Sequence, residues 1–277
     1  MVSGAVCRVV SRVVGEPLAG TAAVASGWVC VEQPGPWGRE VVVPGVGAPG
    51  VRVVLIRRPG RAVVAGSRRV LVASTVPGSE WVRAGVVEEL AGLDVAGVGV
   101  GEHGGWGVPV SGPVLLVCTN GRRDVCCAVV GRPVAAGLAE EFGEAVWEST
   151  HLGGHRFAPT GLLLPSGYAY GGLDVERGRV LLGSEGVVVQ GCRGRSTWSA
   201  PGQVAELAVR ESVGVVGSGE LVVRSVVAGG GGWSVEVGHV DGRVWRVAVA
   251  ERELGVRPAS CGAAPTPVVA HVVTGIR

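Results

Sequence analysis

The stretch VLLVCTNGRRDVCCAVVGRPVAAGLAEEFGEAVWESTHLGGH, residues 114–155, contains two short apolar segments, each followed at once by residue types that bind metals. VLLVC (114–118) predicts a buried strand that ends on a cysteine, and AVWEST (145–150) predicts a second strand that leads into a histidine. AVVGRPVAAGLAEEF (128–142), between them, has helical spacing. The order strand, cysteine loop, helix, strand, histidine loop predicts an α/β fold with its ligand-capable loops after strand ends.

Four residues of this stretch form two pairs of candidate metal ligands. Cys118 and Cys127 are separated by eight residues, and His151 and His155 by three, within HLGGH. Thiolate sulfur and imidazole nitrogen favour zinc or iron–sulfur chemistry over calcium or magnesium. The zinc-protease pattern H-E-x-x-H is absent, because Leu152 stands where its glutamate would be. Spacing alone leaves a zinc site, an iron–sulfur site, and ordinary buried cysteines with turn-capping histidines all open.

Composition narrows the class of protein. The chain has 277 residues, 47% of them hydrophobic and 17% charged, which predicts a globular protein. Its formal net charge is only +2, and the arginines are scattered, so we expect no nucleic-acid partner. Gly, Pro and Arg interrupt every valine run before a membrane-spanning length is reached, and no signal peptide is visible. Seven unevenly spaced cysteines in such a long chain indicate a reducing compartment, so we expect a cytoplasmic protein without a membrane partner.

The flanking sequence predicts further strands and helices. We expect strands at 27–31, 51–57 and 69–74, a helix at 81–93, a Gly-rich linker at 96–113, a helix at 200–212, and strands at 220–227 and 233–240. Asp241-Gly242 predicts a tight hairpin, so the C-terminal region is expected to be a β-meander. The linker suggests a boundary near residue 110, giving an N-terminal α/β region (1–110) and a second domain (111–277).

Two segments carry a resemblance to a known family. CTNGRRDVCCAVVGRP (118–133) and VWESTHLGGHRFAPTGLLLPSGYAYGGL (146–173) resemble the sucrase/ferredoxin-like family of thioredoxin-like ferredoxins. The blocks at 15–38, 192–196, 205–211 and 257–262 also resemble that family. The resemblance implies an α/β fold in which a thioredoxin-like ferredoxin domain follows an N-terminal α/β region and precedes a hairpin-rich tail.

The resemblance also implies a cofactor and its ligands. The branch of the family that this chain resembles holds a [2Fe–2S] cluster with two cysteines and two histidines, which correspond here to Cys118, Cys127, His151 and His155. Cys126 is adjacent to Cys127 and stays open as the alternative ligand. The remaining cysteines are expected to be structural or free thiols: Cys7, Cys30, Cys192 and Cys261.

The function implied is one-electron transfer with an unknown redox partner protein, a reductase or an acceptor. Two thiolates replaced by neutral imidazoles raise the net charge of the oxidised cluster by two, so electron uptake becomes easier. Rieske centres, which also have two histidines, lie at about −150 to +300 mV, against about −400 mV for plant-type ferredoxins. The second nitrogen of each imidazole can couple electron uptake to proton uptake, so the potential is expected to fall as pH rises.

The same region of sequence bears on two other functions. A structural zinc-binding interaction module would use the same four ligands without electron transfer. Sucrose hydrolysis, which the family name suggests, requires two positioned carboxylates. The motif region offers only scattered ones, expected to be solvated helix charges or local hydrogen-bond acceptors: Asp124, Glu140, Glu141, Glu144 and Glu148. We therefore expect an electron-transfer protein rather than a hydrolase.

Overall fold

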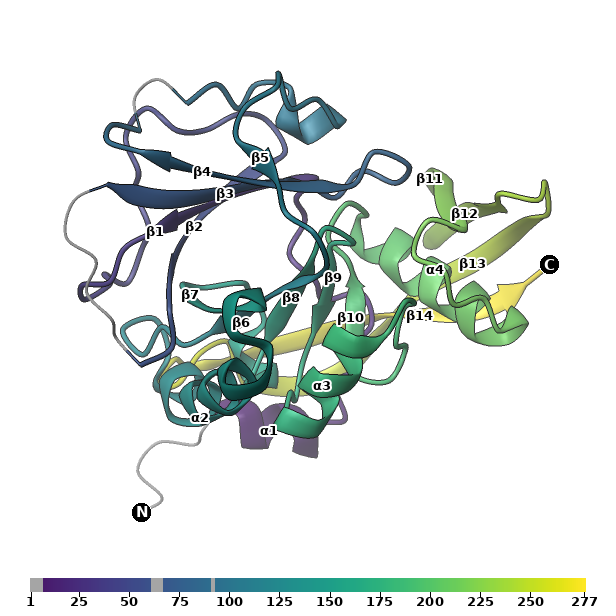
Figure 1. Ribbon diagram of the computed structural model, residues 1–277. Helices are drawn as coiled ribbons and strands as arrows, with labels where there is room; N and C mark the ends of the chain where they lie inside the picture. Colours follow the sequence, from purple (N-terminus) through teal and green to yellow (C-terminus); the bar gives the residue numbers. More distant parts are fainter. Residues whose placement is uncertain (1–6, 61–66, 91–92) are drawn as a thin grey trace, which may run out of the picture.

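A computed structural model describes residues 7–60, 67–90 and 93–277, and a large mixed sheet forms its centre (Figure 1). The ten strands of this sheet lie in the order β10-β9-β8-β6-β7-β2-β1-β3-β4-β5. They are β1 (Gly27–Glu32), β2 (Val51–Arg57), β3 (Arg68–Ser74), β4 (Trp81–Val87), β5 (Val108–Pro109), β6 (Val114–Cys118), β7 (Val146–Ser149), β8 (Gly161–Leu164), β9 (Tyr168–Tyr170) and β10 (Cys192–Arg195). The pairs β1–β2 and β6–β7 are parallel, and the other neighbours are antiparallel. The mixed α/β class predicted from the sequence is confirmed.

The helices are α1 (Cys7–Val13), α2 (Val125–Phe142), α3 (Val175–Gly183) and α4 (Ala200–Val213), with short 3-10 turns η1 (Val98–Val100), η2 (Gly143–Ala145) and η3 (His155–Phe157). The side chain of Asp124 begins α2 by accepting a hydrogen bond from the backbone of Cys126. Gly143 ends the helix with a positive φ of 47°, at the position the sequence predicts. Within the described ranges, no helix is both long and apolar enough to cross a membrane.

One predicted helix is wrong. Residues 81–87 of the segment predicted as helical form strand β4, which pairs antiparallel with β3 from Ser74↔Trp81 to Arg68↔Val87. Three valines and an interior glycine make this segment a poor helix and a good strand, and the exposed edge of β3 supplies its backbone partners. Residues 88–90 are not helical either, and the rest of the prediction includes residues 91–92, which lie outside the described part.

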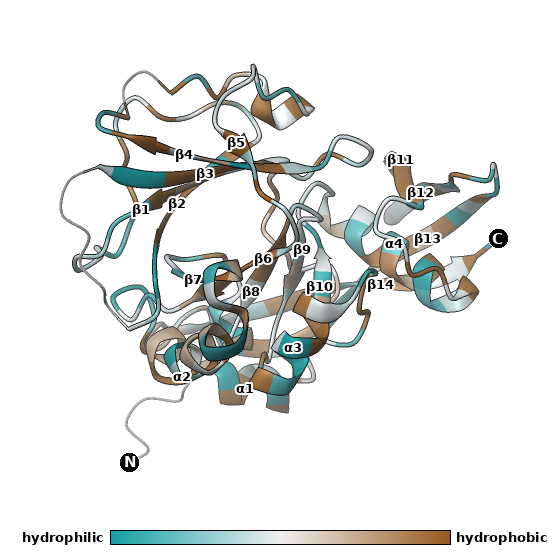
Figure 2. Cartoon of the chain, in the orientation of Figure 1, coloured by the Kyte–Doolittle hydropathy of each residue, from teal (hydrophilic) through white to brown (hydrophobic). Residues whose placement is uncertain are grey.

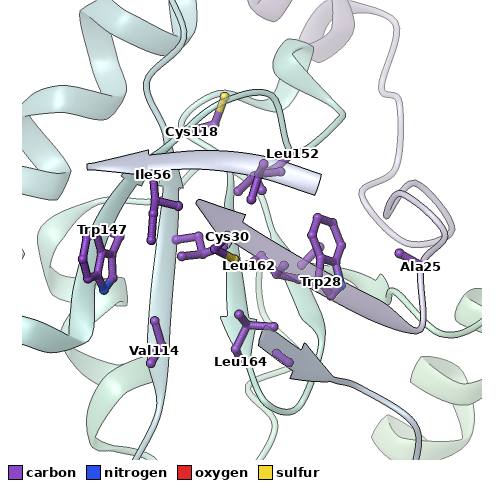
Figure 3. Packing of buried hydrophobic residues seen from close by; sticks show 14 of the residues in the cluster. Ala25, Trp28, Cys30, Ile56, Val114, Cys118, Trp147, Leu152, Leu162 and Leu164 are labelled. Atoms are coloured by element: carbon purple, nitrogen blue, oxygen red, sulfur yellow. The ribbon is translucent and has the colours of Figure 1, made fainter. Parts of the chain in front are cut away.

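The large sheet contains strands from both sides of residue 110. β2 pairs with β7 through Ile56↔Ser149 and Arg57↔Glu148. The division into 1–110 and 111–277 therefore stays a prediction about folding units, while the sheet itself runs across it. Figure 2 shows apolar residues concentrated on the strands of this sheet, and their side chains form the buried core around Trp28, Ile56 and Trp147 (Figure 3).

The C-terminal region is a separate four-stranded antiparallel meander: β11 (Leu221–Gly229), β12 (Gly232–His239), β13 (Val244–Pro258) and β14 (Pro265–Ile276). Gly242 turns with a φ of 98°, so the hairpin predicted there is confirmed. The length of the β13–β14 hairpin was not predicted from the sequence. It extends from the meander back beneath the large sheet to α1 and α2 (Figure 1), and it pairs as far as Pro258↔Pro265. We call residues 259–264 the hairpin tip.

Candidate metal centre

The four sequence-predicted ligands lie at or shortly after the ends of two parallel strands. Cys118 is the last residue of β6 and pairs with Ser149 at the end of β7, so the two strands end at the same edge of the sheet. Cys127 lies in the first turn of α2, directly after the loop that leaves β6. His151 follows β7, and His155 begins η3. The arrangement follows from β-strand register, because parallel strands place their carboxyl ends together.

The two cysteines form a buried thiol pair. Cys118 and Cys127 are 1% and 0% exposed. The pKa of Cys118 is held well below its usual value by a hydrogen bond from the Cys127 thiol and, more weakly, by His151. The pKa of Cys127 is raised by that same contact and by burial. Figure 3 shows the sulfur of Cys118 pointing away from the apolar side chains of the core, so the pair lies at the margin of the core.

The two histidines present nitrogen lone pairs that nothing in the described chain satisfies. Their ring centroids are 5.2 Å apart, and Nδ1 of both His151 and His155 is buried without a hydrogen-bond partner among the described residues. Nε2 of His155 donates to the carbonyl oxygen of Ala259, 2.5 Å away. Burial lowers the pKa of His155, which favours its neutral form. With the proton on Nε2, Nδ1 carries the lone pair, and this is how second-shell hydrogen bonds prepare metal-ligating histidines.

Buried arginines hold the histidine loop. Gly153 and Gly154 have φ values of 84° and 66°, so HLGGH is a loop and not a helical turn, as its glycines predict. The guanidinium of Arg193, itself 0% exposed, donates to the carbonyl of Gly153 at 3.0 Å and to Thr21. No carboxylate pairs with Arg193 among the residues that the structure describes. A buried cation without a carboxylate suits a neighbouring site built from thiolates.

Glu16 anchors the other side of the histidine loop. Its carboxylate accepts hydrogen bonds from Arg156 of η3 at 2.7 Å, from Arg257 of β13 at 2.6 and 2.8 Å, and from Ser11 of α1 at 2.7 Å. These arginines and Ser11 lower the pKa of Glu16 although burial opposes them. The Arg156 guanidinium is therefore engaged inside the protein.

We expect Glu16→Gln to remove pH-dependent stability. Because the folded-state pKa of Glu16 is depressed, its contribution is fully present above the pKa of an unfolded-state glutamate and is lost as pH falls through the folded-state value. The variant should lose about 3 kcal/mol of unfolding free energy at pH 7, since two guanidinium groups lose their partner. Urea unfolding at pH 7 and at pH 3 measures this, and an equal deficit at both pH values would contradict the assignment.

A second cluster of donor atoms lies beside the first. Cys7, Asp124, Cys126 and Cys261 each offer a ligand atom, and these atoms all lie within 4.8 Å of one another. Cys126 Sγ is 3.2 Å from Cys261 Sγ. It therefore contacts this second cluster, whereas Cys127 contacts Cys118. The division supports Cys127 over Cys126 as a partner of the histidines.

Sequence reasoning missed this second cluster. It described Cys7 and Cys261 as structural or free thiols. Both are free cysteines, but the structure places their sulfurs in contact. They lie 254 positions apart, so no local spacing pattern relates them. The only sequence signal was the number of cysteines left over once the two pairs had been assigned.

Four of the five carboxylates of the motif region have structural partners; no partner of Glu140 is found among the described residues. Glu148 is buried and pairs with Arg57 at 2.6 Å, and it also accepts a hydrogen bond from Thr119. Asp124 caps α2 and accepts a hydrogen bond from the backbone of Cys261. The exposed Glu141 and Glu144 pair with arginines: Glu141 with Arg179, and Glu144 with Arg58 and Arg69.

Comparison with known proteins agrees with the sequence motifs. The family model for sucrase/ferredoxin-like proteins matches residues 61–194, just under half of the chain, from ahead of β3 to β10. All four paired ligands lie inside the match, whereas Cys7, the hairpin tip and the other blocks of resemblance at 15–38, 205–211 and 257–262 lie outside it. Neither a curated protein nor a solved structure matches significantly. Residues 61–194 of the chain are therefore similar to the sucrase/ferredoxin-like family.

Proposed function

We propose that the protein is a one-electron carrier whose [2Fe–2S] cluster is held by Cys118, Cys127, His151 and His155. The observation that carries the proposal is the pair of buried histidine Nδ1 atoms, without partners in the described part of the chain, beside a buried thiol pair. Leaving a buried polar atom without a partner costs about 1–3 kcal/mol, so two adjacent ones indicate that both lone pairs have a use. Two sulfur and two nitrogen donors match the ligand set of a histidine-containing [2Fe–2S] centre.

The chain's own residues tune such a site. The buried, positively charged Arg193 lies behind the histidine loop, and Arg52 donates to the carbonyl of His151 at 3.4 Å. The charge of Arg193 favours the thiolate form of Cys118, which the metal requires. Because the imidazoles are neutral ligands, the site carries less negative charge than an all-cysteine one. When bound, the cluster would supply reversible one-electron oxidation and reduction.

Exposure indicates the side from which electrons enter. The side chain of His155 is 11% exposed, whereas Cys118 and Cys127 are buried against β6 and α2. A redox partner protein therefore approaches the cluster most closely over the histidine loop. The identity of that partner, a reductase or an acceptor, is set by surfaces outside this site.

Anaerobic purification from a host with iron–sulfur assembly machinery tests the proposal. We expect a red-brown protein with about two irons and two acid-labile sulfides per chain, and an EPR signal on reduction with dithionite. A colourless, iron-free protein that holds zinc on these four residues would overturn the proposal in favour of a structural zinc module.

The reduction potential of the same preparation is expected to fall as pH rises. Each imidazole keeps a nitrogen that does not bind iron, and its proton is held more tightly when the iron carries one more electron. Reduction is therefore favoured at low pH. Voltammetry from pH 6 to pH 9 measures the slope, and a potential that is independent of pH over this range would contradict histidine ligation.

A further inference from the structure

Three cysteines and an aspartate from distant segments converge outside the proposed cluster. Cys7 begins α1, Asp124 and Cys126 lie at the start of α2, and Cys261 lies in the hairpin tip. The Sγ of Cys261 is 3.6 Å from that of Cys7 and 3.2 Å from that of Cys126, and Asp124 Oδ2 is 3.7 Å from the Cys7 sulfur. The long strands β13 and β14 extend out of the meander and carry the tip to this position (Figure 1).

These distances match one face of a tetrahedral zinc site. Zinc binds thiolate sulfur at about 2.3 Å, so tetrahedral geometry places two sulfur ligands about 3.8 Å apart. Of the two sulfur separations, 3.6 Å is close to that value and 3.2 Å is shorter, and all four donor atoms lie within 4.8 Å of one another. Small side-chain rotations would suffice to complete the site. Three sulfur donors select a thiophilic metal such as zinc over magnesium or calcium.

The surroundings accommodate the negative charge of such a site. The amino-terminal end of α2, an 18-residue helix, points its partial positive charge at Cys126 and Asp124. The backbone N–H groups of Cys126 and Cys261 both donate to the Asp124 carboxylate, at 3.0 Å each. The carboxylate is thereby oriented toward the sulfurs.

A structural role explains why the donors come from these segments. Among the described residues, α1 packs mainly against η3 and β13, and the hairpin tip reaches α2 through Cys261. Both lie against the histidine loop, since Ala259 of the tip accepts the hydrogen bond from His155. A link through one atom would connect α1, α2 and the tip, in the way that structural zinc ions replace a hydrophobic core between small elements.

We propose that Cys7, Cys126, Cys261 and Asp124 bind one structural zinc ion, which connects α1 and the hairpin tip to the start of α2. Binding would release the three thiol protons to solvent and leave a formal charge of −2 on the site, with no oxidation or reduction. This site is separate from the proposed iron–sulfur centre and shares no ligand with it. The two proposals can therefore fail independently.

The experiment measures zinc and iron in the same purified full-length protein. Wild type is expected to hold about one zinc per chain by elemental analysis, bound by thiolates. Cys7→Ser and Cys261→Ser, whose positions are far in sequence from the iron ligands, should each lose zinc. The loss of affinity should exceed the roughly 10–100-fold that removal of an outer-shell partner causes. Cys30→Ala, a buried cysteine outside both clusters, is the matched control and should keep its zinc.

A spectroscopic measurement guards against misfolded variants. Co²⁺ added to zinc-free wild type should give thiolate-to-cobalt charge-transfer absorption, and this absorption should weaken in Cys261→Ser while circular dichroism stays unchanged. Unaltered iron content and visible spectrum in Cys261→Ser would separate this site from the cluster.

Three outcomes would overturn the zinc proposal. The first is wild type without zinc when supplied with it. The second is a Cys126–Cys261 disulfide in peptides prepared without reductant. The third is zinc that is lost in Cys118→Ser and retained in Cys7→Ser, which would place zinc at the iron ligands and remove the electron-transfer proposal as well. A protein that lacks iron, yet loses zinc in Cys7→Ser, would remove only the electron-transfer proposal.

Discussion

Cys118→Ser is expected to abolish iron binding and visible absorbance. The position of Cys118 is constrained: it is the last residue of β6, 1% exposed, and in contact with both Cys127 and His151. A serine hydroxyl at this position is a poor ligand for iron at neutral pH, because it stays protonated where the thiol would ionise. Iron and sulfide analysis of the anaerobically purified variant, beside its circular dichroism spectrum, measures the effect.

Variants of the adjacent residues Cys126 and Cys127 are the control, and they test which of the two cysteines binds iron. Cys127→Ser should lose iron as Cys118→Ser does, whereas Cys126→Ser should keep it, because the Cys126 sulfur contacts Cys261 and not Cys118. The reverse result, iron lost in Cys126→Ser and kept in Cys127→Ser, would show that the register of the first turn of α2 differs by one residue in the loaded protein. Retention of iron in Cys118→Ser would contradict the proposed ligand set itself.

Much of this site could be predicted because its information is local. The strand ends, the cysteine spacing and the histidine loop all lie within residues 114–155, and parallel pairing of β6 with β7 brings them together. The glycines of HLGGH predict a loop, and the loop has two positive φ values. Hydrophobic periodicity likewise predicts α2 and α4, each of which forms close to its expected bounds.

The parts that were missed depend on contacts between distant segments. β4 was predicted as a helix because its local spacing resembles one, and only pairing with β3 makes it a strand. The hairpin tip reaches the site because β13 has 15 residues, and nothing in the tip's own sequence says where it will lie. The cluster of Cys7, Cys126 and Cys261 follows from that placement. The strand β4 and the position of the hairpin tip therefore both depend on long-range strand pairing, which local sequence patterns do not reveal.

A buried charge network joins α4 to the large sheet, and we expect it to affect the free energy of unfolding. Arg210 and Glu206 of α4 are both 0% exposed and pair at 2.6 Å. The hydroxyl of Tyr168 in β9 donates to the same carboxylate oxygen at 2.7 Å. Arg210 also donates to the carbonyl oxygens of Val215 and Gly217. Burial and the adjacent carboxylate together raise the pKa of Tyr168 well above its usual value, so its hydroxyl stays a donor.

Glu206→Ala is expected to destabilise the protein by about 3–5 kcal/mol, because the guanidinium of Arg210 would stay buried without its counter-charge. The double variant Glu206→Met/Arg210→Met should recover most of that loss, since two apolar side chains of similar length remove both charges. Glu141→Ala breaks the exposed pair with Arg179 and should leave the free energy of unfolding nearly unchanged. Denaturant unfolding of the three variants measures these differences. If Glu206→Ala cost no more than Glu141→Ala, the network would contribute no net stability, and the attachment of α4 to β9 would rest on its apolar contacts alone.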